Sequence, residues 1–162
     1  MTLLSRLVPV RNVLLDLDVS SKKRVFEQAG LLFENNLGIG RSQVFDALFE
    51  RERLGSTGLG QGVAIPHGRV KGLREAAGAF LRTRSPIPFE APDNNPVSLI
   101  FVLLVPEKAT DLHLQILSEL AQLFSDRATR EQLASLPNEI EVQRLFSRWE
   151  PHAPDQRRST LQ

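Results

Sequence analysis

One histidine of this chain stands in a setting that would display a reactive ring nitrogen to a partner. His67 follows a short apolar run, Val63–Ile65, and comes directly after Pro66. Proline fixes its own backbone and pushes the preceding residue toward an extended conformation, so we expect the strand Val63–Ile65 to end where His67 begins. Gly68 adds no side chain beside the imidazole. We therefore predict an unshielded histidine at the rim of a sheet.

The loop before this strand is rich in glycine and limits the ligand that the histidine could act on. Its glycines are Gly55, Gly58, Gly60 and Gly62. The run is no P-loop, and Val63 stands where a Gly-x-Gly-x-x-Gly motif needs its third glycine, so nucleotide binding is not predicted. Ser56, Thr57 and Gly58 offer hydroxyl and backbone N–H groups that could hold a phosphoryl group. A plain surface connection between a helix and a strand stays open as the alternative.

A second histidine, His113, falls in the first turn of a helix predicted over 111–125, which Thr110 would cap. It shares the core-facing stripe of that helix with Leu117, Leu120 and Phe124. The helix follows the apolar strand 97–105, and ligands of open α/β sheets bind beyond the carboxyl ends of strands. Position alone leaves two roles open: a site residue, or a core histidine satisfied by a backbone carbonyl.

Arg51 is the cation best placed to join these histidines. With Val44 and Leu48 it forms an i, i+4, i+7 series, which carries the buried stripe of a predicted helix over 41–53 onto its guanidinium. From there the planar guanidinium could reach the glycine loop and hold phosphoryl oxygens. The alternative is a side chain that neutralises the helix end and extends into water. Arg53 lies off the stripe.

The remaining pattern indicates one α/β domain over residues 1–150. Strands are expected over 12–19, 63–65, 78–84 and 97–105, and helices over 21–36, 41–53, 111–125, 128–136 and 139–149. This interleaving favours a three-layer α/β/α sandwich around a mixed, mostly parallel sheet. The run 97–105 is almost wholly apolar, as expected of a central strand covered on both faces. Residues 151–162, with the third histidine, His152, lack periodicity and are predicted to form a disordered tail.

Composition excludes several classes of function. The chain has 162 residues, a formal charge of +1 and no cysteine. The balanced charge favours neither nucleic acid nor an anionic membrane as a partner. Without cysteine there are no disulfides or thiolate metal sites, and the histidine spacing predicts no metal site and no cofactor. No run is apolar over the length of a membrane span, and the start lacks a secretory signal. We expect a cytoplasmic protein.

Taken together, these segments resemble the enzyme IIA domains of the phosphotransferase system, of the fructose, mannitol and nitrogen-regulatory type. The resemblance rests on Arg51-Glu-Arg-Leu-Gly-Ser-Thr-Gly58, on Gly62-Val-Ala-Ile-Pro-His-Gly68, and on Asp111-Leu-His-Leu114 with the apolar stripe behind it. It covers about residues 1–150. The combined signature is far more specific than any single glycine motif.

The resemblance implies a role for each of these residues. In such domains the histidine of the Ile-Pro-His-Gly motif is phosphorylated, which assigns that role to His67, with Pro66 and Gly68 as its backbone support. The matching arginine and second histidine border the site, which points to Arg51 and His113. The phosphoryl group would come from a phosphohistidine of an HPr-like carrier, in a relay that begins at phosphoenolpyruvate. The chain would then be a phosphocarrier rather than a multiple-turnover enzyme on a small molecule.

The resemblance also bears on the branch of the system. Sugar-uptake members often sit beside a IIB domain and a membrane IIC domain, for which we expect no room here. The glycine-loop segment is similar to the nitrogen-regulatory branch, which implies that phosphorylation controls target proteins of unknown identity. A separate sugar-specific IIA that passes phosphate to a IIB protein is the alternative.

Overall fold

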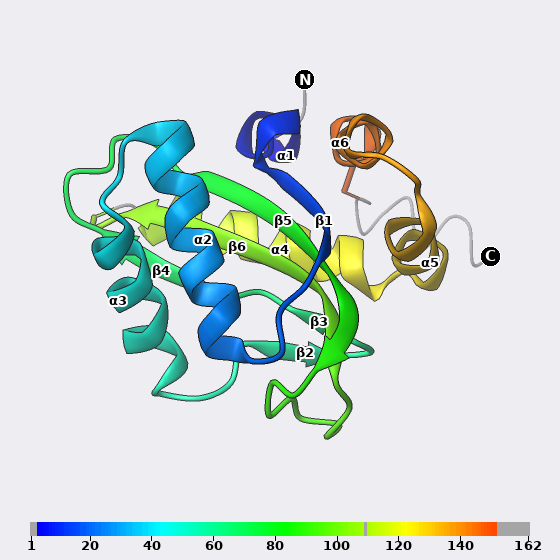
Figure 1. Ribbon diagram of the computed structural model, residues 1–162. Helices are drawn as coiled ribbons and strands as arrows, with labels where there is room; N and C mark the ends of the chain where they lie inside the picture. The colour runs from blue at the N-terminus through cyan, green and yellow to red at the C-terminus, as the bar shows by residue number, and fades with distance from the viewer. Residues whose placement is uncertain (1–2, 109, 152–162) are drawn as a thin grey trace.

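A mixed β-sheet forms the middle of three layers, with helices on both of its faces (Figure 1). The computed structural model describes residues 3–108 and 110–151. Within them the strands are β1 (Val13–Leu17), β2 (Gly58–Gly60), β3 (Val63–Ala64), β4 (His67–Val70), β5 (Ala77–Ile87) and β6 (Val97–Pro106). The helices are α1 (Leu3–Leu7), the 3-10 turn η1 (Val10–Asn12), α2 (Lys22–Leu37), α3 (Arg41–Glu52), α4 (Thr110–Ser125), α5 (Arg127–Ser135) and α6 (Glu139–Arg148).

The order of the strands places β6 at the centre of the sheet. The sheet runs β1-β5-β6-β3-β2, and β4 also pairs with β6. The strands β3 and β4 run parallel to β6, and β1 runs parallel to β5, while β5–β6 and β2–β3 are antiparallel. This mixed sheet between helical layers confirms the predicted fold class.

Alternation along β6 explains why one apolar strand can hold both helical layers. Its odd-numbered residues from Leu99 to Val105 pack with α1, α4, α5 and α6, and Ile100, Val102 and Leu104 pack with α2 and α3. Because successive side chains of a strand point to opposite faces, a run of large aliphatic and aromatic residues fills two cores at once. The prediction that this strand is central and covered on both faces is confirmed.

The helices α2 and α3 form the layer on one face of the sheet, and the glycine loop follows α3. Ser21 caps α2 by accepting a hydrogen bond from the Arg24 amide at 3.2 Å, and Gly38 ends it in the left-handed region at φ 71°. The buried residues of α2 include Val25, Ala29 and Leu32, whose i, i+4, i+7 spacing predicts one core-facing stripe. The predicted bounds of the longer helices differ from the observed ones by one or two residues.

Two predictions about the strands need correction. His67 does not lie beyond the sheet: β3 ends at Ala64, but a second strand, β4, begins at His67 itself. Pro66 cannot donate a hydrogen bond, yet its carbonyl accepts one from the Leu103 amide at 2.9 Å, so contact with β6 continues through the proline. Neither β2 nor β4 was expected, because Gly58–Gly60 and His67–Val70 lack the apolar alternation of a strand.

Gly68 also serves a different purpose from the one predicted. A Cβ atom there would lie 2.8 Å from the carbonyl oxygen of Ala47 in α3, closer than real contacts allow. The missing side chain therefore lets the backbone of α3 approach β4, rather than making room beside the imidazole.

Gly68→Ala should destabilise the fold, because neither backbone can yield without shifting α3 away from the sheet. We expect a loss of about 1–3 kcal/mol in the free energy of unfolding, the usual cost of overpacking. Urea denaturation followed by circular dichroism measures it. The control is Gly40→Ser, which places a favoured cap residue where a Cβ meets nothing within 4 Å. Equal stability of Gly68→Ala and the wild type would contradict this account of α3 packing.

Candidate functional site

Strand pairing brings His67 to the side of the sheet where His113 lies. In the β4–β6 ladder His67 pairs with Leu103 and Gly68 with Leu104. Since Gly68 faces α3, alternation turns His67 to the opposite face, toward α4. The rings of His67 and His113 meet edge to face, with centroids 5.4 Å apart and an interplanar angle of 66°. The two histidines singled out from the sequence thus share one site.

The His67 ring is held by its own backbone in one orientation. Its Nδ1 lies 2.8 Å from the carbonyl oxygen of Ile65, which can only accept a hydrogen bond. In the neutral ring Nδ1 therefore carries the proton, and Nε2 keeps its lone pair for a nucleophilic attack. The ring is half-buried, not unshielded as the sequence suggested, because β4 places it within the sheet beside His113.

His113 presents an unsatisfied ring nitrogen. Its Nε2 atom is buried and has no hydrogen-bond partner within the part of the chain that the structure describes. Buried polar atoms are nearly always paired, and leaving one unpaired costs about 1–3 kcal/mol. A nitrogen of this kind beside His67 is suited to a group that enters the site from outside. The alternative was a core histidine whose ring nitrogen is hydrogen-bonded to a backbone carbonyl, and this does not hold for Nε2 among the described residues.

Both imidazoles are kept neutral by their surroundings. Burial lowers the pKa of His67, and the charge of Arg51 lowers it further, while the Ile65 carbonyl and the Glu52 carboxylate oppose this shift. For His113, burial is again the main reason that its pKa falls, followed by repulsion from His67 and Arg69. Lowered pKa values mean that both rings stay uncharged at neutral pH, so the lone pair of His67 is available there.

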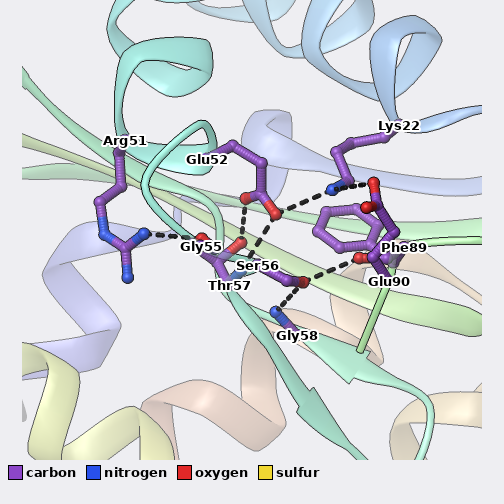
Figure 2. Close-up of polar contacts among 9 residues, drawn as sticks. All are labelled: Lys22, Arg51, Glu52, Gly55, Ser56, Thr57, Gly58, Phe89 and Glu90. Atoms are coloured by element: carbon purple, nitrogen blue, oxygen red, sulfur yellow. Dashed lines mark hydrogen bonds and ion pairs between the residues drawn. The ribbon is translucent and has the colours of Figure 1, made fainter. Parts of the chain in front are cut away.

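Arg51 lies at the end of α3, close enough for its charge to act on His67. Its Nη1 donates a hydrogen bond to the carbonyl oxygen of Gly55 at 2.8 Å, across the glycine loop (Figure 2). The predicted stripe needs correction, however. The buried residues of α3 are Val44, Leu48 and Glu52, and Arg51 stands beside them, partly exposed.

The loop residues use their donors within the protein. The Ser56 hydroxyl donates to the Phe89 carbonyl at 2.8 Å and accepts from the Gly58 amide at 3.1 Å. The Thr57 amide and hydroxyl both donate to the Glu52 carboxylate, at 3.0 and 2.6 Å. In this conformation these groups brace the loop, and their contact with a phosphoryl group stays a prediction.

Glu52 and Lys22 are polar neighbours of the site that the sequence reasoning missed. Glu52 is buried and pairs with Lys22 Nζ at 3.0 Å. The signal was present, because Glu52 continues the Val44–Leu48 series at a further i+4 step. A carboxylate on a buried stripe needs a partner, which makes it more informative than the arginine next to it.

Two other properties bear on the class of site. Over residues 3–108 and 110–151, no three histidine, aspartate or glutamate side chains gather where they could hold a metal ion. Over the same residues, no helix has the length and apolar character needed to cross a membrane. His152 and the tail predicted over 151–162 lie outside the described residues, apart from Pro151.

Comparison with known families identifies the family of this chain. The family described as "Phosphoenolpyruvate-dependent sugar phosphotransferase system, EIIA 2" matches residues 6–149. The chain belongs to this family. The resemblance drawn from the sequence motifs is thereby confirmed, and the paired histidines and the arginine lie within the matched EIIA region.

Relatives of this EIIA chain point to one branch of the family. The nitrogen regulatory protein of Pseudomonas aeruginosa is 43% identical over 132 residues, which cover 81% of this chain and 85% of that protein. Its Escherichia coli K12 counterpart is 38% identical over 128 residues, 78% of each chain. The crystal structure of nitrogen regulatory protein IIA-Ntr from Neisseria meningitidis has a TM-score of 0.86 at 53% identity, covering 90% of this chain and 99% of that one. These findings support a phosphocarrier and regulatory role over a sugar-specific one.

Arg51→Gln should raise the pKa of His67, because it removes a positive charge that disfavours the imidazolium. As pH falls, the acceptor ring would then become protonated at a higher pH than in the wild type. NMR titration of the His67 ring protons measures the midpoint. The matched control is Arg53→Gln, which removes an equal charge from the exposed side of the same helix end and should leave the midpoint in place. A fall in the Arg51→Gln midpoint would contradict the electrostatic account.

Proposed function

We propose that this EIIA protein accepts a phosphoryl group on Nε2 of His67 from a phosphohistidine of an HPr-like carrier. The observation that carries the proposal is that two neighbouring rings each leave one nitrogen free for a phosphoryl group. One is the Nε2 of His67, left with a lone pair by the Nδ1–Ile65 hydrogen bond. The other is the buried, unpaired Nε2 of His113, in the ring next to it.

The transfer is an in-line displacement at phosphorus. The lone pair of His67 Nε2 forms a new N–P bond as the N–P bond of the donor breaks, and the released electron pair stays on the donor imidazole. No separate base is needed, because Nε2 carries no proton in the neutral ring. Moving a phosphoryl group is chiefly a matter of positioning and of stabilising its oxygens.

Arg51 and His113 would stabilise those oxygens. The guanidinium of Arg51 offers a planar set of donors suited to phosphate geometry. If the proton of the neutral His113 ring is on Nε2, this N–H group would donate to a phosphoryl oxygen. It would then have a partner only when a phosphoryl group is present. The phosphorylated state would thus satisfy a donor that the free protein leaves unpaired.

The surface around the site is suited to a protein donor. Leu54, Leu112 and Leu114 are 82%, 40% and 65% exposed, and they flank Arg51 and His113 in sequence. Exposed apolar side chains close in sequence to Arg51 and His113 favour docking by another protein surface rather than by a small substrate.

Regulation of target proteins is the role we favour for the phosphorylated protein. The relatives of 38–43% identity bear the name nitrogen regulatory protein. A phosphoryl group adds about −1.5 to −2 units of charge to the patch around His67, enough to recruit one partner and repel another. The partners are expected to be proteins, with no cofactor and no nucleic acid in the transfer.

Phosphorylation should require His67 alone among the three histidines of the chain. The assay combines phosphoenolpyruvate, the energy-coupling enzyme, an HPr-like carrier and the protein, with the site located by mass spectrometry. We expect His67→Ala to lose all label and His152→Ala to keep it. His113→Ala should take label more slowly, since it loses a stabilising donor. Arg51→Ala should be slower by about 10²–10³-fold, the effect of removing an oxyanion donor.

Two results would overturn this assignment. Undiminished label in His67→Ala together with its loss in His113→Ala would exchange the roles of the two histidines. An Arg51→Ala rate within twofold of the wild type would remove Arg51 from the site.

The regulatory role predicts that partner binding depends on the phosphorylation state. Affinity capture should recover different protein sets with His67→Asp, which places a negative charge in the site, and with His67→Ala, which cannot be charged. Identical sets, combined with fast phosphate transfer to a sugar-branch IIB protein, would favour the sugar-uptake alternative.

A further inference from the structure

An ion pair joins α2 to the end of α3, at the residue that follows Arg51 in the chain. Lys22 Nζ, at the start of α2, is 3.0 Å from Glu52 Oε2 at the end of α3, and their side chains are only 15% and 3% exposed. Figure 2 shows the two side chains pointing toward each other beside the glycine loop. Lys22 also lies 4.8 Å from the centre of the Phe89 ring and 3.4 Å from the exposed carboxylate of Glu90.

Glu52 uses both of its carboxylate oxygens to hold the loop. Oε1 accepts the Thr57 hydroxyl at 2.6 Å, and Oε2 accepts the Thr57 amide at 3.0 Å as well as the Lys22 ammonium. Hydrogen bonds to an ionised group are about twice as strong as neutral ones. Thr57, at the end of the loop that follows α3, is therefore hydrogen-bonded to the last residue of that helix.

The same loop holds Arg51. The amides of Leu54 and Gly55 donate to the carbonyls of Arg51 and Glu52, each at 3.1 Å, which folds the chain back on the helix end. The Gly55 carbonyl then receives the Arg51 guanidinium at 2.8 Å. Release of Thr57 by Glu52 would free the loop, and with it the carbonyl that orients Arg51.

We propose that Glu52 is a positioning residue for phosphoryl transfer, which acts through the Thr57–Gly55 loop on Arg51, with Lys22 as its buried counter-ion. This inference rests on the proposed role of His67 as acceptor. Glu52 does not touch the phosphoryl group. It sets where the guanidinium stands, and a displacement of about 1 Å can cost 10²-fold in rate.

The charge of Glu52 gives the proposal a second readout. Its carboxylate opposes the lowering of the His67 pKa, while Arg51 contributes to that lowering. The charged groups that shift the His67 pKa are thus Arg51 and Glu52, both from α3. The His113 ring of α4 faces His67, and its pKa is lowered by burial and then by His67. With Arg51 already removed, neutralising Glu52 should move the His67 midpoint down, in the opposite direction to Arg51→Gln.

A second ion pair supplies the matched control. Glu34 and Arg41 join the other ends of the same two helices, with an N–O distance of 2.6 Å. Glu34 also accepts the amide of Arg41 at 3.0 Å, so it braces a helix end as Glu52 braces a loop. Glu34→Gln therefore tests the loss of a carboxylate between α2 and α3 away from the site.

The experiment compares Glu52→Gln and Glu34→Gln as full-length proteins. Glu52→Gln keeps the side-chain shape but loses the negative charge and one of the two acceptor oxygens that serve Lys22 and Thr57. We expect phosphoryl transfer from the carrier to slow by about 10–10²-fold, with the KM for the carrier little changed. In the Arg51→Ala background, where only the charge of Glu52 is lost, Glu52→Gln should lower the His67 midpoint measured by NMR. Glu34→Gln should transfer within twofold of the wild type.

A double-mutant cycle decides whether Glu52 acts through Arg51. In the Arg51→Ala background, Glu52→Gln should slow transfer by no more than about twofold, because its target is already gone. An undiminished effect in that background would overturn the proposal, as would a folded Glu52→Gln protein with the wild-type rate. Lys22→Met serves if Glu52→Gln does not fold, and a wild-type rate there would equally contradict the proposal. Label that persists in His67→Ala would instead contradict the proposed function.

Discussion

The parallel pairing of β4 with β6 is the interaction on which the site depends. Four residues, His67–Val70, pair with Leu103–Pro106, and this register alone decides which face His67 occupies. A shift by one residue would turn its ring toward α3 and direct Gly68 toward α4. The missing side chain of Gly68 secures the register, because any larger residue would meet the Ala47 carbonyl. Packing on one face of the strand thus fixes the chemistry on the other.

Burial keeps the His67 ring neutral, so that no separate base has to remove a proton from its nucleophilic nitrogen. It is the largest cause of the lowered pKa of both His67 and His113, so the rings stay neutral while lying side by side. Two imidazolium ions with ring centroids 5.4 Å apart would repel each other and any cation nearby. A neutral pair instead offers the lone pair and the N–H group that the proposed phosphoryl transfer uses together.

Much of this arrangement could be predicted from the sequence, and the exceptions have physical causes. Two strong local signals are the almost wholly apolar run 97–105 and the i, i+4, i+7 spacing of Val25, Ala29 and Leu32. The buried strand and the buried helix stripe that they predict are both present. The short strands β2 and β4 carried no such signal, since β2 exists only because β3 offers backbone groups to pair with, and β4 only because β6 does. Local pattern cannot show such pairing, and it therefore left His67 outside the sheet.

The same limit explains why Arg51 was found and Glu52 was not. Adjacent helical residues point about 100° apart, so the two side chains leave the end of α3 in different directions. One joins the buried seam with Lys22, and the other crosses the loop to Gly55. The i+7 step from Val44 pointed to Arg51, whereas Glu52 at the i+8 step is the residue that lies on the buried side of α3.

The buried carboxylate of Glu52 is tolerated because both of its oxygens accept hydrogen bonds. Lys22 arrives from α2 and Thr57 from the loop, so the helix end, its neighbour and the loop meet at one acceptor group. A buried charge that lacked either partner would be costly, which makes the three elements depend on one another. In the proposed arrangement, Arg51 is thus held in place by the contacts of a residue that never enters the site.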